Sequence, residues 1–168
     1  MLFRSAVILG KYHNFELKDS KKLSEKKRLM LSMDIQKNAS EVSIGEASAE
    51  EIDSLNIKEA SLLAMERAIL GLNEQNLEVI VDGVDLPKVI FPSQAIIKAD
   101  EKIPEVMAAS IVAKVYRDNL MIDFSNKFPD FSLEKNKGYP TKKHLNILKL
   151  LGPTKYHRMS FKPVLNVR

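Results

Sequence analysis

Two apolar, β-branched runs, each followed by an aspartate, constrain the fold of this chain more than any other feature. The first run leads from Leu77 into Asp82, and the second leads from Gln94 into Asp100. A β-branched run without polar alternation predicts a strand buried on both faces, and a residue at its end lies at the carboxyl edge of the sheet. Open α/β sheets bind their ligands at that edge. The two aspartates are therefore the first candidates for a functional site.

Asp82 and Asp100 also indicate a kind of ligand. Two carboxylates brought together by neighbouring strands repel each other, so a hard cation with oxygen ligands is their natural neutraliser. This interpretation predicts a site for Mg²⁺ or Mn²⁺. Aspartate is also common where a strand enters a turn, so on these residues alone a purely structural role stays open.

Helical and strand patterns alternate along the chain, which predicts an α/β fold with a mainly central sheet. Its 168 residues, 45% of them hydrophobic, suit one domain with a substantial core. We expect strands at residues 3–9, 41–47, 77–82 and up to 98, and helices at 24–37, from 48, at 56–72, 104–126 and 141–151. The N-capping side chains that predict helix starts are Ser24, Ser48, Asn56 and Thr141.

Several functional classes lose support because their features are absent from the sequence. No apolar stretch approaches the length of a membrane span, and the chain start is too short for a signal peptide, which predicts a cytoplasmic protein. There is no cysteine, which fits a reducing compartment and excludes disulfides, thiolate zinc sites and a cysteine nucleophile. Glycine-rich nucleotide loops, a nucleophile-elbow serine and a His-Glu-x-x-His helix are missing too. The histidines, His13, His144 and His157, share no ligand-like spacing, so we interpret them as structural. Metal-assisted phosphoryl transfer remains.

The formal charge of +4 and the pI near 9.2 are modest, so the distribution of charge matters more than its size. Basic residues gather in two parts of the chain. The first cluster is Lys18, Lys21, Lys22, Lys26, Lys27 and Arg28, and the second extends from Lys135 to Lys162. Such clusters are either solvated helix faces or the footprint of a polyanion, and nucleic acid is the obvious polyanion.

Several separate stretches match one known family, in the family's order. They are Asp19-Ser-Lys-Lys-Leu-Ser24, Glu51-Ile-Asp53 with Asn56-Ile57, Val81-Asp-Gly83, Ala108-Ala-Ser-Ile-Val-Ala-Lys-Val-Tyr-Arg-Asp118, Lys137-Gly-Tyr-Pro-Thr141 and His157-Arg-Met-Ser-Phe161. On these motifs the chain resembles bacterial ribonuclease HII, the type 2 ribonuclease H, from Ser5 to Val164. Chance does not readily produce so many ordered matches.

The resemblance implies a ribonuclease H-like fold, in which helices flank a mixed central sheet. It also implies endonucleolytic cleavage of RNA in RNA–DNA hybrids and at single ribonucleotides embedded in duplex DNA. The implied reaction is two-metal hydrolysis with Mg²⁺ or Mn²⁺, which leaves a 3′-hydroxyl and a 5′-phosphate. By motif, Asp82 and Asp100 correspond to two of the family's four catalytic, metal-binding carboxylates.

The same motifs imply residues that bind nucleic acid. Tyr139 resembles the family tyrosine that stacks on the deoxyribose beside the ribonucleotide, although a tyrosine in a turn is otherwise typical of packing. Lys21 and Lys22 are similar to lysines that contact backbone phosphates, or else they form a solvated approach to a helix. The residues expected to assist the same surface are Lys137, Arg158 and Ser160.

The sequence departs from the family at its start. The family hallmark Asp-Glu-Ala-Gly-Arg-Gly, which ends the central first strand and supplies the other two metal carboxylates, is absent from the 168 residues. Ser5 to Leu9 matches the segment that follows it. We therefore expect a sheet without its first, central strand, half of a metal site, and a strongly impaired nuclease. Ala99, where glycine is common, is a minor departure if its φ is negative.

Three hypotheses stay open. The first is a ribonuclease HII enzyme whose given sequence lacks its true beginning. The second is a non-catalytic protein, derived from that family, that binds RNA–DNA hybrids without cutting them. The third is a basic structural protein with nonspecific DNA affinity, which explains the charge but none of the motifs. Each predicts a nucleic-acid partner and no membrane, and we expect a monomer.

Overall fold

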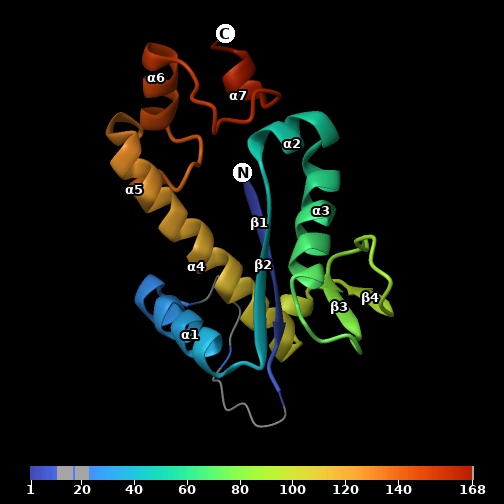
Figure 1. The fold of residues 1–168 in the computed structure, drawn as a ribbon. Coiled ribbons are helices and arrows are strands. Elements are labelled where there is room, and N and C mark those ends of the chain that lie inside the picture. Colours follow the sequence, from blue (N-terminus) through green and yellow to red (C-terminus); the bar gives the residue numbers. More distant parts are fainter. Residues whose placement is uncertain (11–16, 18–22, 168) are drawn as a thin grey trace.

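The computed structural model describes residues 1–10, 17 and 23–167, in which helices and strands are intermixed along the chain (Figure 1). In chain order the elements are β1 (Leu2–Ile8), α1 (Glu25–Asn38), β2 (Glu41–Ala47), α2 (Ala49–Leu55), α3 (Ile57–Leu70), β3 (Val79–Asp82), β4 (Ser93–Ile96), the 3-10 helix η2 (Ala99–Glu101), α4 (Pro104–Lys127), the 3-10 helix η3 (Pro129–Phe131), α5 (Leu133–Asn136), α6 (Lys142–Leu151) and α7 (Lys162–Leu165). In Figure 1, α3 lies on one side of β1 and β2, and α1 and α4 lie on the other. The architecture is mixed α/β, as predicted.

Local capping groups begin several helices where the sequence predicts them. The side chains of Ser24 and Thr141 each accept a backbone N–H from the third residue of α1 and α6. Ser48 and Glu51 form a reciprocal capping box at the start of α2. Such bonds satisfy N–H groups that a helix start leaves without an intrahelical partner.

The described strands form two separate pairs rather than one sheet. β1 and β2 run antiparallel, with Leu2 opposite Ala47 and Ile8 opposite Glu41. β3 and β4 run parallel, from Val79 opposite Ser93 to Asp82 opposite Ile96. The combination of antiparallel and parallel pairing fits the mixed sheet that the family resemblance implies. Among the described residues, no strand is hydrogen-bonded to both pairs.

Close packing of α3 on β2 depends on small residues. Ala60, Ala64 and Ala68 of α3 are 0%, 0% and 1% exposed. A Cβ on Gly45 of β2 would lie 2.0 Å from the Ala64 carbonyl oxygen, so only glycine allows the helix to come this close. This contact fixes α3 over the first strand pair.

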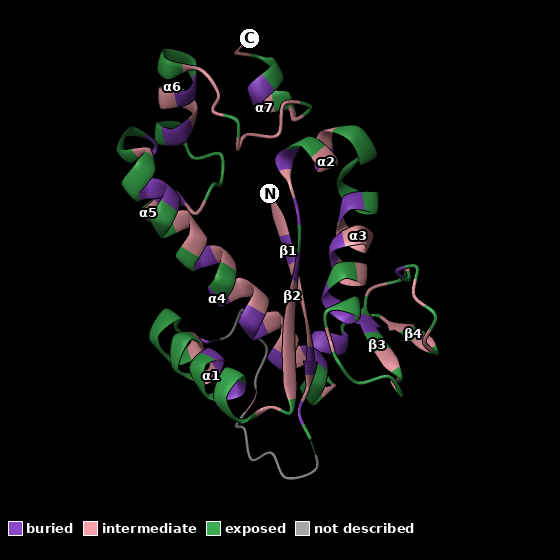
Figure 2. Ribbon diagram, in the orientation of Figure 1, coloured by how far each residue is buried: buried purple, intermediate pink, exposed green. Residues whose placement is uncertain are grey.

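Helix α4 extends through both main groups of buried apolar residues (Figure 2). One group joins α4 to β1 and α1, and its members are Val7, Leu9, Leu23, Ile35, Ala108, Ile111 and Val112. The other joins the end of α4 to the C-terminal helices, and its members are Phe124, Phe131, Leu133, Leu148 and Val164. The helix is thus the common support for the strands and the C-terminal segment.

Two details of the second strand pair differ from the sequence prediction. The prediction that β3 is buried on both faces is wrong, because Ile80 is 40% exposed and lies against a cavity rather than a neighbouring strand. The strand expected to reach residue 98 ends at Ile96, since Lys98 adopts a left-handed conformation with φ 58°. Ala99 has a negative φ, so the alanine is accommodated without strain.

Candidate functional site

Asp82 and Asp100 lie together at the carboxyl end of the β3–β4 pair. Asp82 is the last residue of β3, and Asp100 is in η2, the turn of helix that follows β4. The Ala99 N–H donates a hydrogen bond of 3.0 Å to Asp82 Oδ1, so a backbone group beside Asp100 orients the first carboxylate. Asp100 is 6% exposed, whereas Asp82 is exposed. Parallel pairing thus brings together two carboxylates that are 18 positions apart in the chain, that is 100 minus 82.

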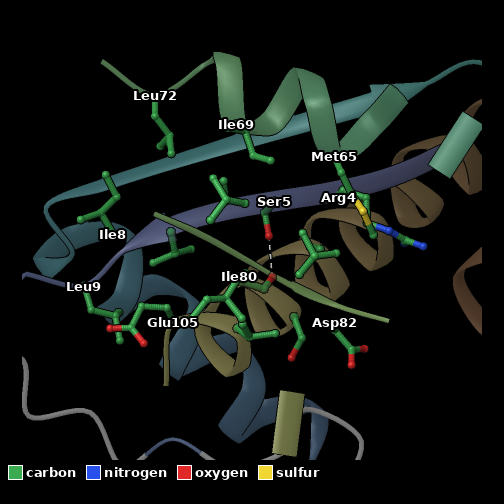
Figure 3. Close-up of a pocket in the computed structure, with 18 of the residues that line it drawn as sticks. Arg4, Ser5, Ile8, Leu9, Met65, Ile69, Leu72, Ile80, Asp82 and Glu105 are labelled. Carbon is green, nitrogen blue, oxygen red and sulfur yellow. Dashed lines mark hydrogen bonds between the residues drawn. The ribbon is translucent and has the colours of Figure 1, made fainter. Parts of the chain in front are cut away.

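Two arginines line the same cavity as Asp82, and the sequence reasoning missed both. Arg4 of β1 lines the same cavity as Asp82 (Figure 3), and its Nη2 donates to Ser61 Oγ at 2.8 Å. Burial lowers the pKa of Arg4, the charge of Asp82 raises it, and Arg117 lowers it. Arg117 of α4 lines this cavity and also a second cavity, which Tyr139 lines too. A signal existed only for Arg117, which lies within the matched Ala108–Asp118 stretch.

Arg117 also supports the turn that carries Tyr139. Its guanidinium lies 5.3 Å from the Tyr139 ring centroid, and its Nη2 donates to the Lys137 carbonyl at 3.2 Å. Tyr139 is 55% exposed, so an aromatic face is presented to solvent. The Lys137 side chain, by contrast, is largely covered, and its Nζ lies 3.9 Å from Glu25 Oε1. The turn is therefore held by an arginine that also lines the cavity of Asp82 and Asp100.

Arg158 and Ser160, both predicted to assist nucleic-acid binding, make contacts within the chain. Arg158 Nη2 donates to the Met1 carbonyl at 2.8 Å, and its guanidinium lies 4.8 Å from the Phe161 ring centroid. Ser160 Oγ and N–H both donate to Asp53 Oδ1, at 2.5 and 2.9 Å. The carboxylate of Asp53 thereby anchors the C-terminal segment to α2. Lys21 and Lys22 lie outside the described residues.

Burial raises the pKa of Asp53, but the hydrogen bonds from Ser160 and Met159 outweigh it and hold that pKa below its usual value. The charged form of Asp53 is the one that accepts these bonds, so the anchor is intact at neutral pH.

His144 and His157 form a pair beside a second cavity of about 390 Å³. The Thr154 N–H donates to His157 Nδ1 at 3.0 Å, so the proton of neutral His157 is on Nε2. His157 Nε2 lies 3.4 Å from His144 Nε2, which accepts this hydrogen bond. The proton of neutral His144 is therefore on Nδ1. His144 Nδ1 is buried without a hydrogen-bond partner. Burial lowers the pKa of both imidazoles, and His144 lowers that of His157 further. The two imidazoles contact each other and Thr154, and the interpretation that they are structural stays a prediction; His13 lies outside the described residues.

The donor set at Asp82 and Asp100 fits a hard divalent ion in kind, because both side chains offer carboxylate oxygens. The set contains few ligands: among residues 1–10, 17 and 23–167, no three histidine, cysteine, aspartate or glutamate side chains cluster in a way that could hold a metal. Within those same ranges, no helix combines the length and apolarity needed to cross a membrane.

Comparison with known sequences gives one consistent family. The family model described as Ribonuclease HII matches residues 5–164. The Ribonuclease HII of Desulforamulus reducens is 45% identical over 164 residues, which cover 97% of this chain and 83% of the relative. The Ribonuclease HII of Hydrogenovibrio crunogenus is 48% identical over 163 residues, which cover 97% and 79%.

Solved structures of related proteins have the same fold. Ribonuclease H2 from Pyrococcus horikoshii superimposes with a TM-score of 0.70 at 22% identity, over 90% of this chain and 80% of its own. RNase HII from Archaeoglobus fulgidus, solved as a complex with PCNA, gives 0.69 at 30% identity, over 89% and 79%. Bst-RNase HIII, solved in complex with Mn²⁺, gives 0.63 at 13% identity, over 89% and 56%, and supports the fold alone.

Proposed function

The chain belongs to the ribonuclease HII family of type 2 ribonuclease H endonucleases, and we propose that its site acts on single ribonucleotides in duplex DNA as well as on longer RNA–DNA hybrids. The observation that carries this proposal is the bond from the Ala99 N–H to Asp82, which holds the Asp82 carboxylate beside the backbone of Asp100 at the end of a parallel strand pair. Arg117 extends the same site to the exposed ring of Tyr139.

Asp82 and Asp100 would hold Mg²⁺ or Mn²⁺ through their carboxylate oxygens. When bound, such ions supply an activated water and neutralise the charge that develops on the leaving oxygen. The family membership supports a divalent ion here, and Mn²⁺ is the metal of the Bst-RNase HIII structure. Buried Asp100 and exposed Asp82 offer one ligand from within the protein and one from its surface.

The chain's other residues would bind and orient the substrate. The guanidinium groups of Arg4 and Arg117 place positive charge in the cavity that Asp82 lines and would attract backbone phosphates, which gives affinity without sequence preference. The Tyr139 ring would stack on the sugar beside the ribonucleotide and so position the scissile phosphate. Lys21, Lys22 and Lys137 would add phosphate contacts.

Residues 1–168 contain two of the four carboxylates that the resemblance implies, so we propose that cleavage by this polypeptide is strongly impaired. An in-line displacement between two ions needs oxygen ligands on both sides of the scissile phosphate. Asp82 and Asp100 come from one strand pair and provide ligands on one side.

The test is cleavage of a DNA duplex that contains one ribonucleotide, with Mn²⁺ or Mg²⁺ present. We expect slow incision next to the ribonucleotide, with a 3′-hydroxyl and a 5′-phosphate as products, and no incision of an all-DNA duplex. Asp82→Asn should abolish the incision, and Asp85→Asn should not, because Asp85 pairs with Lys58 on the surface instead. Equal cleavage of the all-DNA duplex would overturn the proposal.

A non-catalytic hybrid-binding protein is the second candidate. Its support is the absence of any third metal-type side chain beside Asp82 and Asp100 among the described residues. It predicts that the chain binds the ribonucleotide-containing duplex more tightly than plain DNA, yet shows no incision that depends on Asp82. A nonspecific basic protein, in contrast, would bind both duplexes alike, with the same loss of affinity in salt.

A further inference from the structure

A second cavity lies among the C-terminal helices, and Asp82 and Asp100 do not line it. Its volume is about 390 Å³, and sites for small molecules typically have volumes of about 300–1,000 Å³. The last turns of α4 supply part of its wall together with α6 and α7, which lie at the same end of the molecule (Figure 1). One lining residue from each helix is Phe124, Leu145 and Val164. We call this space the C-terminal cavity.

Most of the wall of the C-terminal cavity is aromatic or aliphatic. Phe124 and Tyr156 line it with their ring centroids 4.3 Å apart, and Phe131 lines it with its centroid 5.3 Å from that of His157. Aromatic walls favour a planar aromatic ligand, because its face and its edge can both meet their rings. An apolar protein cavity of about 150 Å³ binds benzene. The larger C-terminal cavity therefore has room for two fused rings.

Two arginines place positive charge at the same cavity. Arg117 and Arg158 both line it, and they donate to the carbonyl oxygens of Lys137 and Met1. In the described part of the chain, neither guanidinium forms an ion pair with a carboxylate. Burial lowers the pKa of Arg158 and the charge of Arg117 lowers it further, whereas Asp53 raises it. An anion in the cavity would offset the repulsion between the two guanidinium groups.

A buried donor adds a third feature. His144 lines the cavity and is 5% exposed. Its Nδ1, which carries the proton, has no hydrogen-bond partner among the described residues. Leaving a buried donor unsatisfied is costly, and a ligand that brings an acceptor oxygen to this nitrogen would remove the cost. The lining thus combines apolar rings, two positive charges and a donor without an acceptor.

We propose that the C-terminal cavity binds a small aromatic carboxylate of one or two rings. The rings of the ligand lie among the aromatic walls, and its carboxylate faces Arg117 and Arg158. A neutral apolar molecule would leave both guanidinium groups without a counter-charge, and inorganic phosphate would leave the aromatic walls without a partner. The lining therefore selects a ligand that has both parts. The proposal is separate from the proposed nuclease function, because binding requires neither metal nor nucleic acid.

The probe is 2-naphthoate, and the matched control is 2-naphthamide, which keeps the shape of the probe but carries no charge. Calorimetric titration of the full 168-residue chain should show saturable binding of one naphthoate, at least about ten-fold tighter than that of the amide. Arg117→Gln should remove this preference for the charged probe and leave the affinity for the amide unchanged. Bound naphthoate should shift the methyl resonances of Leu145 and Leu148, which line the cavity, and not those of Ile90, which does not.

A second control changes the cavity itself. Leu145→Trp places a large side chain in the cavity and should abolish binding of naphthoate. Leu150→Trp, on the same helix at a position that is 77% exposed and outside the cavity lining, should not. Circular dichroism establishes that both variants are folded, and the comparison of the two probes needs no variant.

Three results would overturn the proposal. The first is equal affinity of the unaltered chain for naphthoate and naphthamide, which includes no binding of either. The second is binding of naphthoate that survives Leu145→Trp. The third is displacement of naphthoate by an equal concentration of inorganic phosphate, since the site would then recognise a small anion without its rings.

Discussion

At the scale of single residues, Asp82 and Asp100 differ in their surroundings. Asp100 is almost fully buried, and Asp82 is exposed but oriented by the Ala99 N–H. A bound divalent ion would relieve the repulsion between the two charges, and it would stabilise the folded chain because the unfolded chain does not hold the two together.

Metal binding is therefore expected to raise the melting temperature through this pair. At a Mn²⁺ concentration of ten times the dissociation constant, the free energy of unfolding should rise by about 1.4 kcal/mol. Asp82→Asn and Asp100→Asn should each remove most of this gain. Asp85→Asn, which changes an exposed aspartate paired with Lys58, is the matched control and should keep it. A Mn²⁺-dependent shift of equal size in all four proteins would contradict the assignment.

Tyr139 provides a second test at this scale. Its exposed ring lies 5.3 Å from the Arg117 guanidinium, which holds it in place. If the ring stacks on a sugar or base, Tyr139→Ala should weaken binding of a duplex with one ribonucleotide by about 1–3 kcal/mol, roughly 5- to 150-fold. Tyr139→Phe keeps the ring and should bind like the unaltered chain. Fluorescence anisotropy measures both, and equal losses in the two variants would show that the hydroxyl, not the ring, matters.

At the scale of helices and strands, local signals predicted more than distant ones. The helix starts at Ser24, Ser48 and Thr141 follow from side chains that bond to N–H groups a few residues away. The end of β3 at Asp82 was predicted for the same reason, from its own run of residues. The exposure of Ile80 was not, because burial depends on which strand lies next to β3, and that strand pairing is not encoded in the local pattern.

The candidate site likewise contains residues that the local sequence predicts and residues whose place depends on distant packing. Asp82 and Asp100 end recognisable runs, so the sequence brings both to attention. Arg4 is an arginine within a strand, a position without any distinguishing pattern, and its place near Asp82 depends on how β1 is set against β3. The bond from the Ser160 hydroxyl to Asp53 was not foreseen either, and the role of Ser160 in nucleic-acid binding stays a prediction.

The contact between α6 and the turn at residues 154–157 predicts a dependence of stability on pH. The folded pKa values of His144 and His157 are lowered, mainly by burial, so below about pH 6.5 the unfolded chain takes up protons first. Protonation of either ring would also place two N–H groups face to face. The histidine contribution to stability is therefore present above about pH 6.5 and is lost as the pH falls through the folded pKa values.

The measurement is urea unfolding between pH 7 and pH 5. The free energy of unfolding should fall with pH, by at most about 1.4 kcal/mol per pH unit for each histidine. His157→Phe keeps an aromatic ring beside Phe131 and removes one titrating group, so its stability should depend less on pH over this range. The quantity compared between the unaltered chain and His157→Phe is the slope of the free energy of unfolding against pH, not the absolute stability. Equal slopes in the two proteins would rule out the histidine pair as the cause of the pH dependence.

At the scale of the whole molecule, the site is divided between two parts of the fold. The carboxylates come from the β3–β4 pair, while the basic and aromatic groups come from β1, α4 and the turn before α6. Helix α4 holds these parts in place, since it contacts β1, β3 and the C-terminal helices. That these 168 residues fold as one domain stays a prediction from their length and composition.

We propose that the chain presents half of a nuclease metal site. The most direct test compares cleavage of a duplex with one ribonucleotide by this chain and by a version with a strand ending in Asp-Glu-Ala-Gly-Arg-Gly added before Met1. We predict that the added segment raises the single-turnover rate by at least about a hundred-fold in Mn²⁺. The gain should disappear in Asp82→Asn. Equal rates with and without the added segment would show that Asp82 and Asp100 are not half of a nuclease metal site.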